Sequence, residues 1–267
     1  MRKIIAIAHR GDSSRALENS LEAVRLALAV PVDMIEVDIR KSRDNRLYVM
    51  HDKDTGRTAD APIDIEQSTA EEIALVRLKN GEPIPTLADV LKEVAGKTVL
   101  NFEIKSDGAG GLCAAHILGS GYKGPVLVSS FKEREVTEVR RIMPSAHTAQ
   151  IFEKLTPQEL NGYKAKGYNI VSVKKKAVNE ELIAACRAKK IKVYVWTVDE
   201  EDDMRKLALV LLGIGGLLSA CVAYEVPGPD GRYYGDRYRD GTPDRSYRDR
   251  DRDGVPNHQD RRPDDPR

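Results

Sequence analysis

The chain has 267 residues, a length that suits either one large α/β barrel or two domains of ordinary size. Its 43 Lys and Arg residues nearly balance its 42 Asp and Glu residues, and a net charge of +1 argues against a protein that binds nucleic acid through a basic surface. Cys113, Cys186 and Cys221 are an odd number of cysteines without metal-ligand spacing, which predicts reduced thiols in a cytoplasmic protein rather than a disulfide framework.

Short apolar runs alternate with amphipathic stretches from the N-terminus to about residue 200. The first run, Ile4–Ala8, is shorter than the roughly 7–15 apolar residues of a secretory signal, so we expect it to be a strand. The apolar runs predict strands at residues 3–8, 34–39, 47–50, 99–104, 126–129, 170–173 and 192–195. The amphipathic stretches predict helices at residues 21–30, 87–94, 112–120, 133–142, 157–166 and 180–190, with Thr86, Thr156 and Asn179 among the capping residues. Strands that alternate with helices pair in parallel through crossovers, so the predicted fold is α/β.

Residues 52–85 interrupt this alternation, because a stretch with Pro and acidic residues replaces a simple crossover there. The segment follows a strand. We therefore expect a small insertion at the C-terminal ends of the strands, where barrel enzymes keep their active sites.

The composition changes after residue 222. From residue 227 to the end the charged residues are Asp and Arg only, and aliphatic side chains are almost absent. Such a segment cannot form a core that offsets the entropy of ordering the chain. We therefore predict a barrel domain at residues 1–222 and a low-complexity tail at residues 223–267. Four acids of the tail have the spacing of a calcium loop, namely Asp249, Asp251, Asp253 and Asp260. The same spacing can arise by chance in an Asp/Arg-rich tract.

Acidic side chains are expected to converge from two strands. Glu36 and Asp38 lie two residues apart, so they point to one face of their strand while Val37 points to the other. Glu103 shares a face with Lys105 in the strand near residues 99–104. An exposed face with solvated acids would show the same spacing, but apolar neighbours favour a covered strand. Three carboxylates at strand ends suit Mg²⁺ or Ca²⁺ better than zinc.

Two histidines follow predicted strands directly. His9 and His51 are expected at strand C-terminal ends, where a pair of histidines can divide general acid and general base catalysis. Either histidine alone would be a structural residue as often as a catalytic one. Their shared setting beside carboxylates favours a catalytic role for both. Arg10 offers a planar fork of donors that fits two phosphate oxygens or, alternatively, one of the acids. The remaining histidines, which fall on a predicted helix, in a predicted loop and in the tail, are assigned no chemistry: His116, His147 and His258.

These residues belong to a series of motifs that resembles the glycerophosphodiester phosphodiesterase family in order and spacing. The motifs are His9-Arg10-Gly11, Glu18-Asn19-Ser20, Glu36-Val37-Asp38, His51-Asp52, Pro85-Thr86-Leu87, Glu103-Ile104-Lys105, Ser129-Ser130-Phe131 and Val195-Trp196-Thr197-Val198. The resemblance implies a TIM-type (β/α)8 barrel and hydrolysis of a glycerophosphodiester to glycerol 3-phosphate and an alcohol such as choline or ethanolamine. The attacking hydroxyl could come from water or from the glycerol itself, and the resemblance does not decide between them.

The resemblance also implies roles for individual residues. Glu36, Asp38 and Glu103 would bind one divalent cation, Mg²⁺ or Ca²⁺, and His9 and His51 would act as general acid and base. Arg10 and Lys105 would hold the phosphate. Trp196 would contact the glycerol, unless it is a core aromatic residue.

Two alternatives use the same residues. A lysophospholipase D needs this site and an apolar channel, for which the insertion offers Ile63, Ile65, Ile73 and Leu75. A barrel that binds metal or phosphate without turnover is the other alternative.

The end of the matched region departs from the family. Residues 213–220 align with its closing segment but lack both of its acids. Residues 204–221 also resemble a bacterial lipoprotein signal, with a basic start, an apolar run and Cys221 as the lipidated residue. A fusion and a degenerate last strand both explain this ending, and we expect attachment to a membrane or envelope only if Cys221 is lipidated.

Overall fold

The structure is a computed structural model that describes residues 3–198 and 221–225. In chain order its elements are β1 (Lys3–His9), α1 (Leu21–Leu28), β2 (Met34–Lys41), β3 (Leu47–Val49), the 3-10 helix η1 (Thr55–Arg57), α2 (Ala70–Ala74), α3 (Leu87–Val94), β4 (Val99–Ile104), α4 (Ala109–Gly119), β5 (Val126–Ser130), α5 (Glu133–Ile142), β6 (His147–Phe152), α6 (Glu159–Ala165), β7 (Ile170–Lys174), the 3-10 helix η2 (Lys175–Ala177), α7 (Glu180–Ala188), β8 (Lys192–Trp196) and β9 (Cys221–Glu225). The predicted strands and helices are all present, with ends shifted by a few residues.

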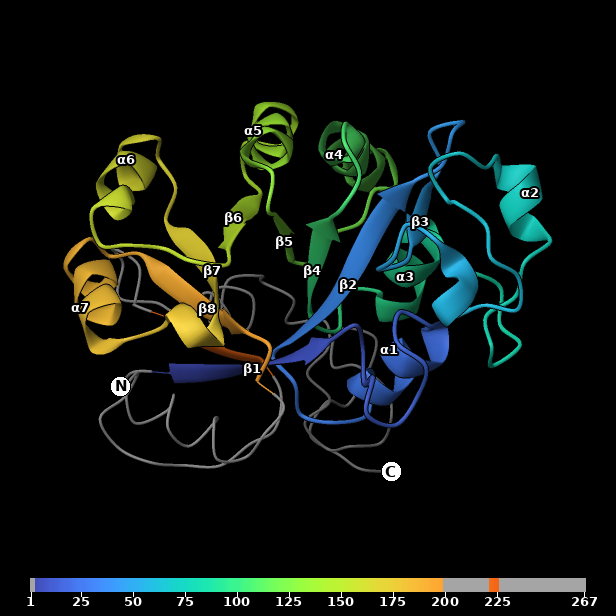
Figure 1. Cartoon of the computed structure of the whole chain (residues 1–267), viewed down its shortest axis with the longest axis horizontal. Helices are drawn as coiled ribbons and strands as arrows, with labels where there is room; N and C mark the ends of the chain where they lie inside the picture. The colour runs from blue at the N-terminus through green and yellow to red at the C-terminus, as the bar shows by residue number, and fades with distance from the viewer. Residues whose placement is uncertain (1–2, 199–220, 226–267) are drawn as a thin grey trace, which may run out of the picture. The chain divides into compact units, whose positions relative to one another are not determined.

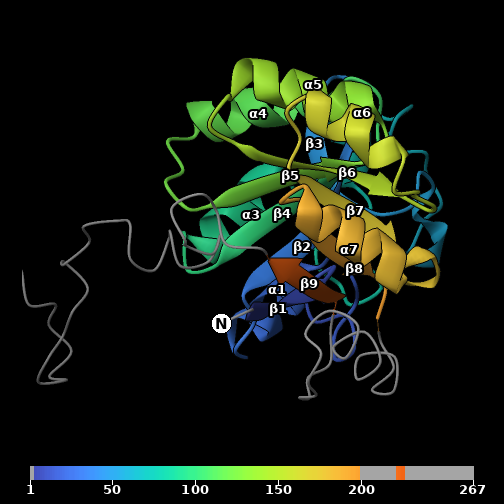
Figure 2. The ribbon, with the colours of Figure 1, turned by 90° about the vertical axis from the view of Figure 1, so that its left-hand side faces the viewer.

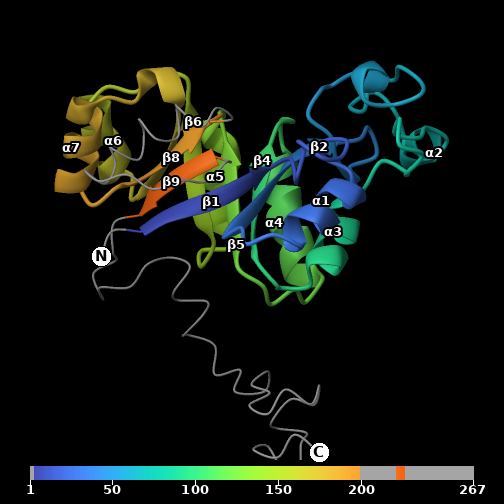
Figure 3. The same cartoon turned by 90° about the horizontal axis from the view of Figure 1, so that it is seen from below.

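The strands form a closed ring of hydrogen-bonded neighbours. β1, β2, β4, β5, β6, β7 and β8 pair in parallel in that order, and β9 pairs with both β8 and β1. Figure 1 shows the curled sheet with helices along its outside, and in Figures 2 and 3 β9 lies between β1 and β8. This α/β arrangement confirms the predicted fold class.

The eighth position of the ring differs from the predicted (β/α)8 pattern, because β9 runs antiparallel to both of its neighbours. A strand in either direction satisfies the backbone donors and acceptors on the open edges of β1 and β8, so the ring closes without a parallel last strand. Residues 204–220, which we compared with the family's closing segment and with a lipoprotein signal, lie outside the described residues, and so do residues 226–267 with their calcium-loop spacing. Residues 223–225, which we had assigned to the low-complexity tail, form the end of β9.

Five short elements were not predicted from the sequence, namely α2, β6, β9 and the two 3-10 helices η1 and η2. β6 begins at His147, which we had placed in a loop; its sequence, His-Thr-Ala-Gln-Ile-Phe, lacks an apolar run although Thr148, Ala149 and Ile151 are buried. α2 is a short helix within the insertion, and a capping box between Thr69 and Glu72 begins it. Pairing with β5 and β7 supplies the context that makes a strand of a weakly apolar segment.

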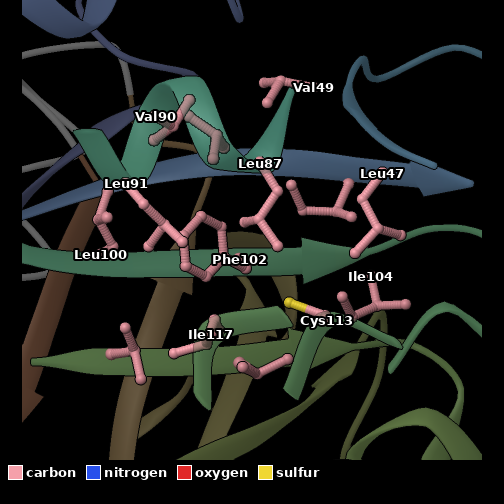
Figure 4. Packing of buried hydrophobic residues seen from close by; sticks show 14 of the residues in the cluster. Leu47, Val49, Leu87, Val90, Leu91, Leu100, Phe102, Ile104, Cys113 and Ile117 are labelled. Carbon is pink, nitrogen blue, oxygen red and sulfur yellow. The ribbon is translucent and has the colours of Figure 1, made fainter. Parts of the chain in front are cut away.

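The main core lies between the sheet and the helices. In Figure 4, Leu87 and Leu91 of α3 and Ile117 of α4 pack with Leu100 and Phe102 of β4. Each large side chain that is fully buried in this way contributes on the order of 1.5–3 kcal/mol to folding. This layer fixes β2 and β4, the strands that carry the acidic residues.

Capping residues predicted from the sequence lie at the N-termini of several helices. Thr86 caps α3 through a capping box with Asp89, and the side chain of Asn179 accepts the N–H of Leu182 in α7. We had expected Thr156 to cap a helix that begins at residue 157, but α6 begins at Glu159 and the residue before it is Gln158. Thr156 still exchanges hydrogen bonds with Glu159. Within the described ranges no helix is long and apolar enough to cross a membrane.

The insertion has a small apolar cluster of its own. Residues 52–85 pack against the end of β3, and the buried members of this cluster are Tyr48, Met50, Ala59, Ile65, Ile73, Val76, Leu78 and Ile84. β3 itself pairs antiparallel with the C-terminal half of β2, through Ile39 and Val49 among others. The insertion is therefore attached at the end of the barrel to which the parallel strands point.

Candidate active site

A cavity of about 270 Å³ opens at the C-terminal ends of the parallel strands. Most of the cavity's titratable residues come from strand ends or from the residues just after them, whereas Glu36 and Tyr194 lie within β2 and β8. The lining residues are Ile7, His9, Arg10, Glu36, His51, Asn101, Glu103, Lys105, Ser129, Phe131, Ile151, Glu153, Ser172, Tyr194, Val195, Trp196 and Thr197. Most of the residues singled out in the sequence are thus brought together here.

Glu36, Asp38 and Glu103 form a cluster of carboxylates in which one oxygen of each lies within 4.8 Å of the others. β2 and β4 place them in register, because Asp38 is paired with Glu103 across the two parallel strands. Glu36 is 5% exposed and Asp38 is fully buried. The alternative of a solvated acidic face is therefore wrong.

Asp38 is held ionised by its neighbours. Its carboxylate lies 3.2 Å from Lys105 Nζ and 3.3 Å from Arg10 Nε, and the amide of Asn19 donates to it at 2.9 Å. Burial alone would raise the pKa of Asp38, but the charges of Lys105 and Arg10 outweigh it and lower that pKa. Burial likewise opposes the charge on Lys105, and Asp38 and Glu103 raise its pKa in spite of it.

Glu36 is in the opposite situation. Burial and the nearby charges of Asp38 and Glu103 raise the pKa of Glu36 well above its usual value. One oxygen, Oε2, accepts the backbone N–H of Arg10 at 2.9 Å. The other, Oε1, is buried and has no hydrogen-bond partner among the described residues. An unpartnered buried carboxylate oxygen beside two further carboxylates fits a hard divalent cation, which would remove the cost of crowding these charges.

The two histidines lie on the cavity wall. His9 Nε2 is 3.9 Å from Glu36 Oε2, and His51 Nδ1 is 2.7 Å from Asp52 Oδ1. An ionised carboxylate can only accept a hydrogen bond, so this contact requires Nδ1 of His51 to be the donor. Both histidines line the cavity, where side chains of this type can serve in general acid or base catalysis.

The loop after β1 bends sharply to bring the Arg10 guanidinium back to Asp38. Arg10 has a φ of 59° and Gly11 a φ of 74°, both in the left-handed region. A Cβ added at Gly11 would lie 2.7 Å from the backbone carbon of Ala23, so only glycine fits. Asn19, also at a φ of 59°, ends the loop and accepts the N–H of Asp38 at 3.1 Å.

Aromatic rings form the apolar wall of the cavity. Phe131 and Trp196 meet edge to face with their ring centroids 5.5 Å apart. Trp196 lines the cavity, although its indole nitrogen is buried. Phe131 is 42% exposed, and Lys105 Nζ lies 5.9 Å from its ring centroid.

Several residues at this site were not assigned a role from the sequence. Asn19 and Glu18 lie in a motif that we noticed without giving it a function, and Phe131 lies in another. Arg57, in the insertion, contacts both Glu18 and Asp52. No pattern in the sequence pointed to it, because its partners lie in two separate loops.

Comparison with known proteins identifies the relatives of this chain. The sequence model of the glycerophosphoryl diester phosphodiesterase family matches residues 9–218. The chain belongs to this family. Its members are phosphoric diester hydrolases, which confirms the predicted enzyme class.

Individual relatives agree with this membership. A glycerophosphodiester phosphodiesterase of Caldanaerobacter subterraneus subsp. tengcongensis is 28% identical over 232 residues, which cover 81% of this chain and 94% of that protein. A crystal structure of a glycerophosphodiester phosphodiesterase from Parabacteroides distasonis is similar with a TM-score of 0.68 and 25% identity, over 77% of this chain and 89% of that one. A phosphodiesterase of Oleispira antarctica, solved with its product sn-glycerol-3-phosphate, gives a TM-score of 0.71 at 22% identity, over 76% and 88% of the two chains, and shows the same fold.

Proposed function

We propose that this protein hydrolyses glycerophosphodiesters to glycerol 3-phosphate and an alcohol, with one divalent cation held by Glu36, Asp38 and Glu103. The observation that carries the proposal is the cluster of three carboxylates within 4.8 Å, in which Glu36 Oε1 is buried without a partner among the described residues. Glu36 and Glu103 of this cluster line a cavity that is also lined by two histidines and by the positively charged Arg10 and Lys105. When bound there, Mg²⁺ or Ca²⁺ would supply positive charge to the phosphate oxygens and lower the pKa of the attacking hydroxyl.

The remaining groups divide the work on the phosphate. Arg10 and Lys105 line the cavity and carry fixed positive charge, so they suit the two non-bridging oxygens of a phosphodiester. One of the histidines, His9 and His51, takes the proton of the attacking hydroxyl as the new P–O bond forms. The other donates a proton to the alcohol oxygen as the old P–O bond breaks, so the two protons balance.

The aromatic wall gives the glycerol a place to bind. Phe131 and Trp196 present an apolar corner beside the polar half of the cavity, and the carbon face of a glycerol unit fits such a corner. The names of the relatives and the product in the Oleispira antarctica structure support glycerol 3-phosphate as the product.

The position of the bond that breaks tests this proposal. Glycerophosphocholine is incubated with the full chain and Mg²⁺ or Ca²⁺, and ³¹P NMR identifies the phosphorus product. We expect glycerol 3-phosphate with free choline. Phosphocholine with free glycerol would contradict the proposal, and turnover of lysophosphatidylcholine alone would favour a lysophospholipase D.

A matched pair of variants separates the site from the fold. Glu36→Gln keeps the shape of the side chain but removes its charge, and we expect it to abolish product formation. Glu138→Gln makes the same change on α5, where the glutamate pairs with Arg141 away from the cavity, and it should leave activity unchanged. Equal activity in both variants would remove Glu36 from the mechanism.

A further inference from the structure

Arg57 of the insertion contacts two of the loops that bear active-site residues. Its Nε lies 2.5 Å from Asp52 Oδ2, and its two terminal nitrogens lie 2.9 and 2.6 Å from the carboxylate oxygens of Glu18. All three guanidinium nitrogens are therefore used. Arg57 itself does not line the cavity.

Each carboxylate that Arg57 contacts holds a residue of the cavity with its other contacts. Asp52 Oδ1 lies 2.7 Å from His51 Nδ1. Glu18 Oε1 accepts from Arg10 at 2.9 Å, and Arg10 Nε lies 3.3 Å from Asp38. One guanidinium thus connects the proposed acid–base residue His51 with the proposed phosphate-binding residue Arg10.

The backbone of Arg57 is fixed independently of these ion pairs. It is the last residue of η1, whose first turn is capped by the side chain of Asp54. The carbonyl of Arg57 accepts from Lys79 Nζ at 2.8 Å, and the buried hydroxyl of Thr55 bonds to the carbonyl of Ala61 at 2.6 Å. The backbone from which the guanidinium extends is therefore held by the folded insertion, whatever the state of the ion pairs.

The ionisation of this network is consistent with a fixed arrangement. Burial would raise the pKa of both Asp52 and Glu18. Hydrogen bonds from His51 and Arg57 lower the pKa of Asp52 in spite of it. Hydrogen bonds from Arg57 and the charge of Arg10 do the same for the pKa of Glu18. Both carboxylates accordingly stay charged, and Asp52 accepts a hydrogen bond from the Nδ1–H of His51.

We propose that Arg57 is a positioning residue that holds His51 and Arg10 in register, so that the insertion completes the active site without touching the substrate. This inference rests on the roles proposed above for His51 and Arg10. A lysine cannot replace Arg57, because a single ammonium cannot reach three carboxylate oxygens on two loops in the planar geometry of a guanidinium.

A purely structural ion pair would behave differently. Arg57 is half exposed, and pairs at exposed sites contribute little to stability. Arg43 provides the comparison, since it is similarly exposed and pairs with Glu72 of the insertion at 3.5 Å without contact to a cavity residue. If Arg57 only attached the insertion, Arg57→Ala and Arg43→Ala would have similar effects.

Steady-state kinetics test the proposal with three variants of the full chain, Arg57→Ala, Arg57→Lys and Arg43→Ala, each with circular dichroism to verify folding. With glycerophosphocholine and saturating Mg²⁺, we expect Arg57→Ala to lower kcat by about 100-fold, the loss typical of misplaced catalytic groups. Arg57→Lys should remain folded and still lose most of kcat, and Arg43→Ala should match the unmodified chain. Added guanidinium should restore part of the activity of Arg57→Ala and none to Arg57→Lys.

A second measurement does not depend on activity. The imidazole ¹⁵N signals of His51, assigned with His51→Gln, report which ring nitrogen carries the proton. We expect Nδ1–H in the unmodified chain and in Arg43→Ala, and a mixture of tautomers in Arg57→Ala. If the unmodified chain does not cleave glycerophosphocholine but the tautomer changes in Arg57→Ala, the positioning role stands and the proposed function fails. If kcat and the His51 signals of Arg57→Ala equal those of Arg43→Ala, the positioning role is wrong.

Discussion

The backbone N–H of Arg10 donates a 2.9 Å hydrogen bond to Glu36 Oε2, so the loop that carries the phosphate-binding candidate also holds a candidate metal ligand. The same loop aims the Arg10 guanidinium at Asp38, 3.3 Å away. The turn after β1 therefore contacts both the candidate metal ligands on β2 and the candidate phosphate-binding site, and a substitution that alters one of these sites should affect the other.

The metal-free chain should lose stability as the pH rises, because of Glu36. Burial beside Asp38 and Glu103 raises the pKa of Glu36 well above 4.5, so the folded chain keeps a proton that the unfolded chain releases. The free energy of unfolding then falls as the pH rises above 4.5. Glu36→Gln removes this loss, and in EDTA we expect it to melt at a higher temperature than the unmodified chain at pH 7. Identical melting profiles of the two chains across pH would contradict the crowding of charges.

Addition of a divalent cation should make the unmodified chain melt at a higher temperature than Glu36→Gln. A cation that binds only the folded chain stabilises it by about 2.7 kcal/mol at a concentration of 100 times its Kd. We expect calorimetry to show a rise in melting temperature with Mg²⁺ or Ca²⁺ for the unmodified chain and little change for Glu36→Gln. An equal rise in both would place the cation elsewhere.

Gly11→Ala should distort the Arg10 turn. The new Cβ would meet the backbone of Ala23 at 2.7 Å, and the φ of 74° is costly for alanine. We expect a loss of roughly 1–3 kcal/mol in the free energy of unfolding by urea, together with a fall in kcat/KM. Gly162→Ala is the control: it lies in α6 with nothing within 4 Å of the added Cβ, and it should stabilise the chain by roughly 0.5–1 kcal/mol. A tolerated Gly11→Ala would show that the loop can bend in another way.

Glu135 should matter for stability and not for catalysis. It is buried at the start of α5, and it accepts the backbone N–H groups of Gly108 at 2.8 Å and Gly110 at 2.7 Å, where α4 has no cap of its own. We expect Glu135→Ala to lower the free energy of unfolding by roughly 1–3 kcal/mol, since the buried N–H of Gly110 and the more exposed N–H of Gly108 both lose their acceptor. KM for glycerophosphocholine should not change, and an altered KM without a loss of stability would be evidence against a purely structural role.

Much of this architecture is predictable from the sequence because the signals are local. Apolar runs mark β2 and β4, and the two-residue period places Glu36 and Asp38 on one face. Strand ends meet in a barrel, so acids and histidines from separate motifs could be expected to converge.

The remaining features depend on contacts between distant segments. β6 has few apolar residues and forms a strand through pairing on both sides. The direction of β9 depends on the open edges of β1 and β8, which no window of sequence reveals. Arg57 reaches Glu18 and Asp52 from a third segment, and long side chains of this kind acquire partners only in three dimensions.

The position of β9 bears on the lipoprotein hypothesis. Cys221 begins this strand, with its Cα opposite that of Ile7 in β1. Cleavage before Cys221 would cut the covalent link between β9 and the rest of the barrel. We therefore expect mass spectrometry of the chain expressed in a bacterium to show intact protein of 29.7 kDa with an unmodified Cys221. A product that begins at a lipidated Cys221 would establish the opposite.

Metal-dependent cleavage at the carboxylate cluster is the central claim, and one titration tests it most directly. The purified chain is stripped with EDTA, and the release of glycerol 3-phosphate from glycerophosphocholine is followed as Mg²⁺ or Ca²⁺ is added. The account predicts no release without metal, saturable recovery with one of the two cations, and no recovery in Glu36→Gln. Release from the metal-free chain at the rate of the metal-loaded chain, or full recovery in Glu36→Gln, would contradict it.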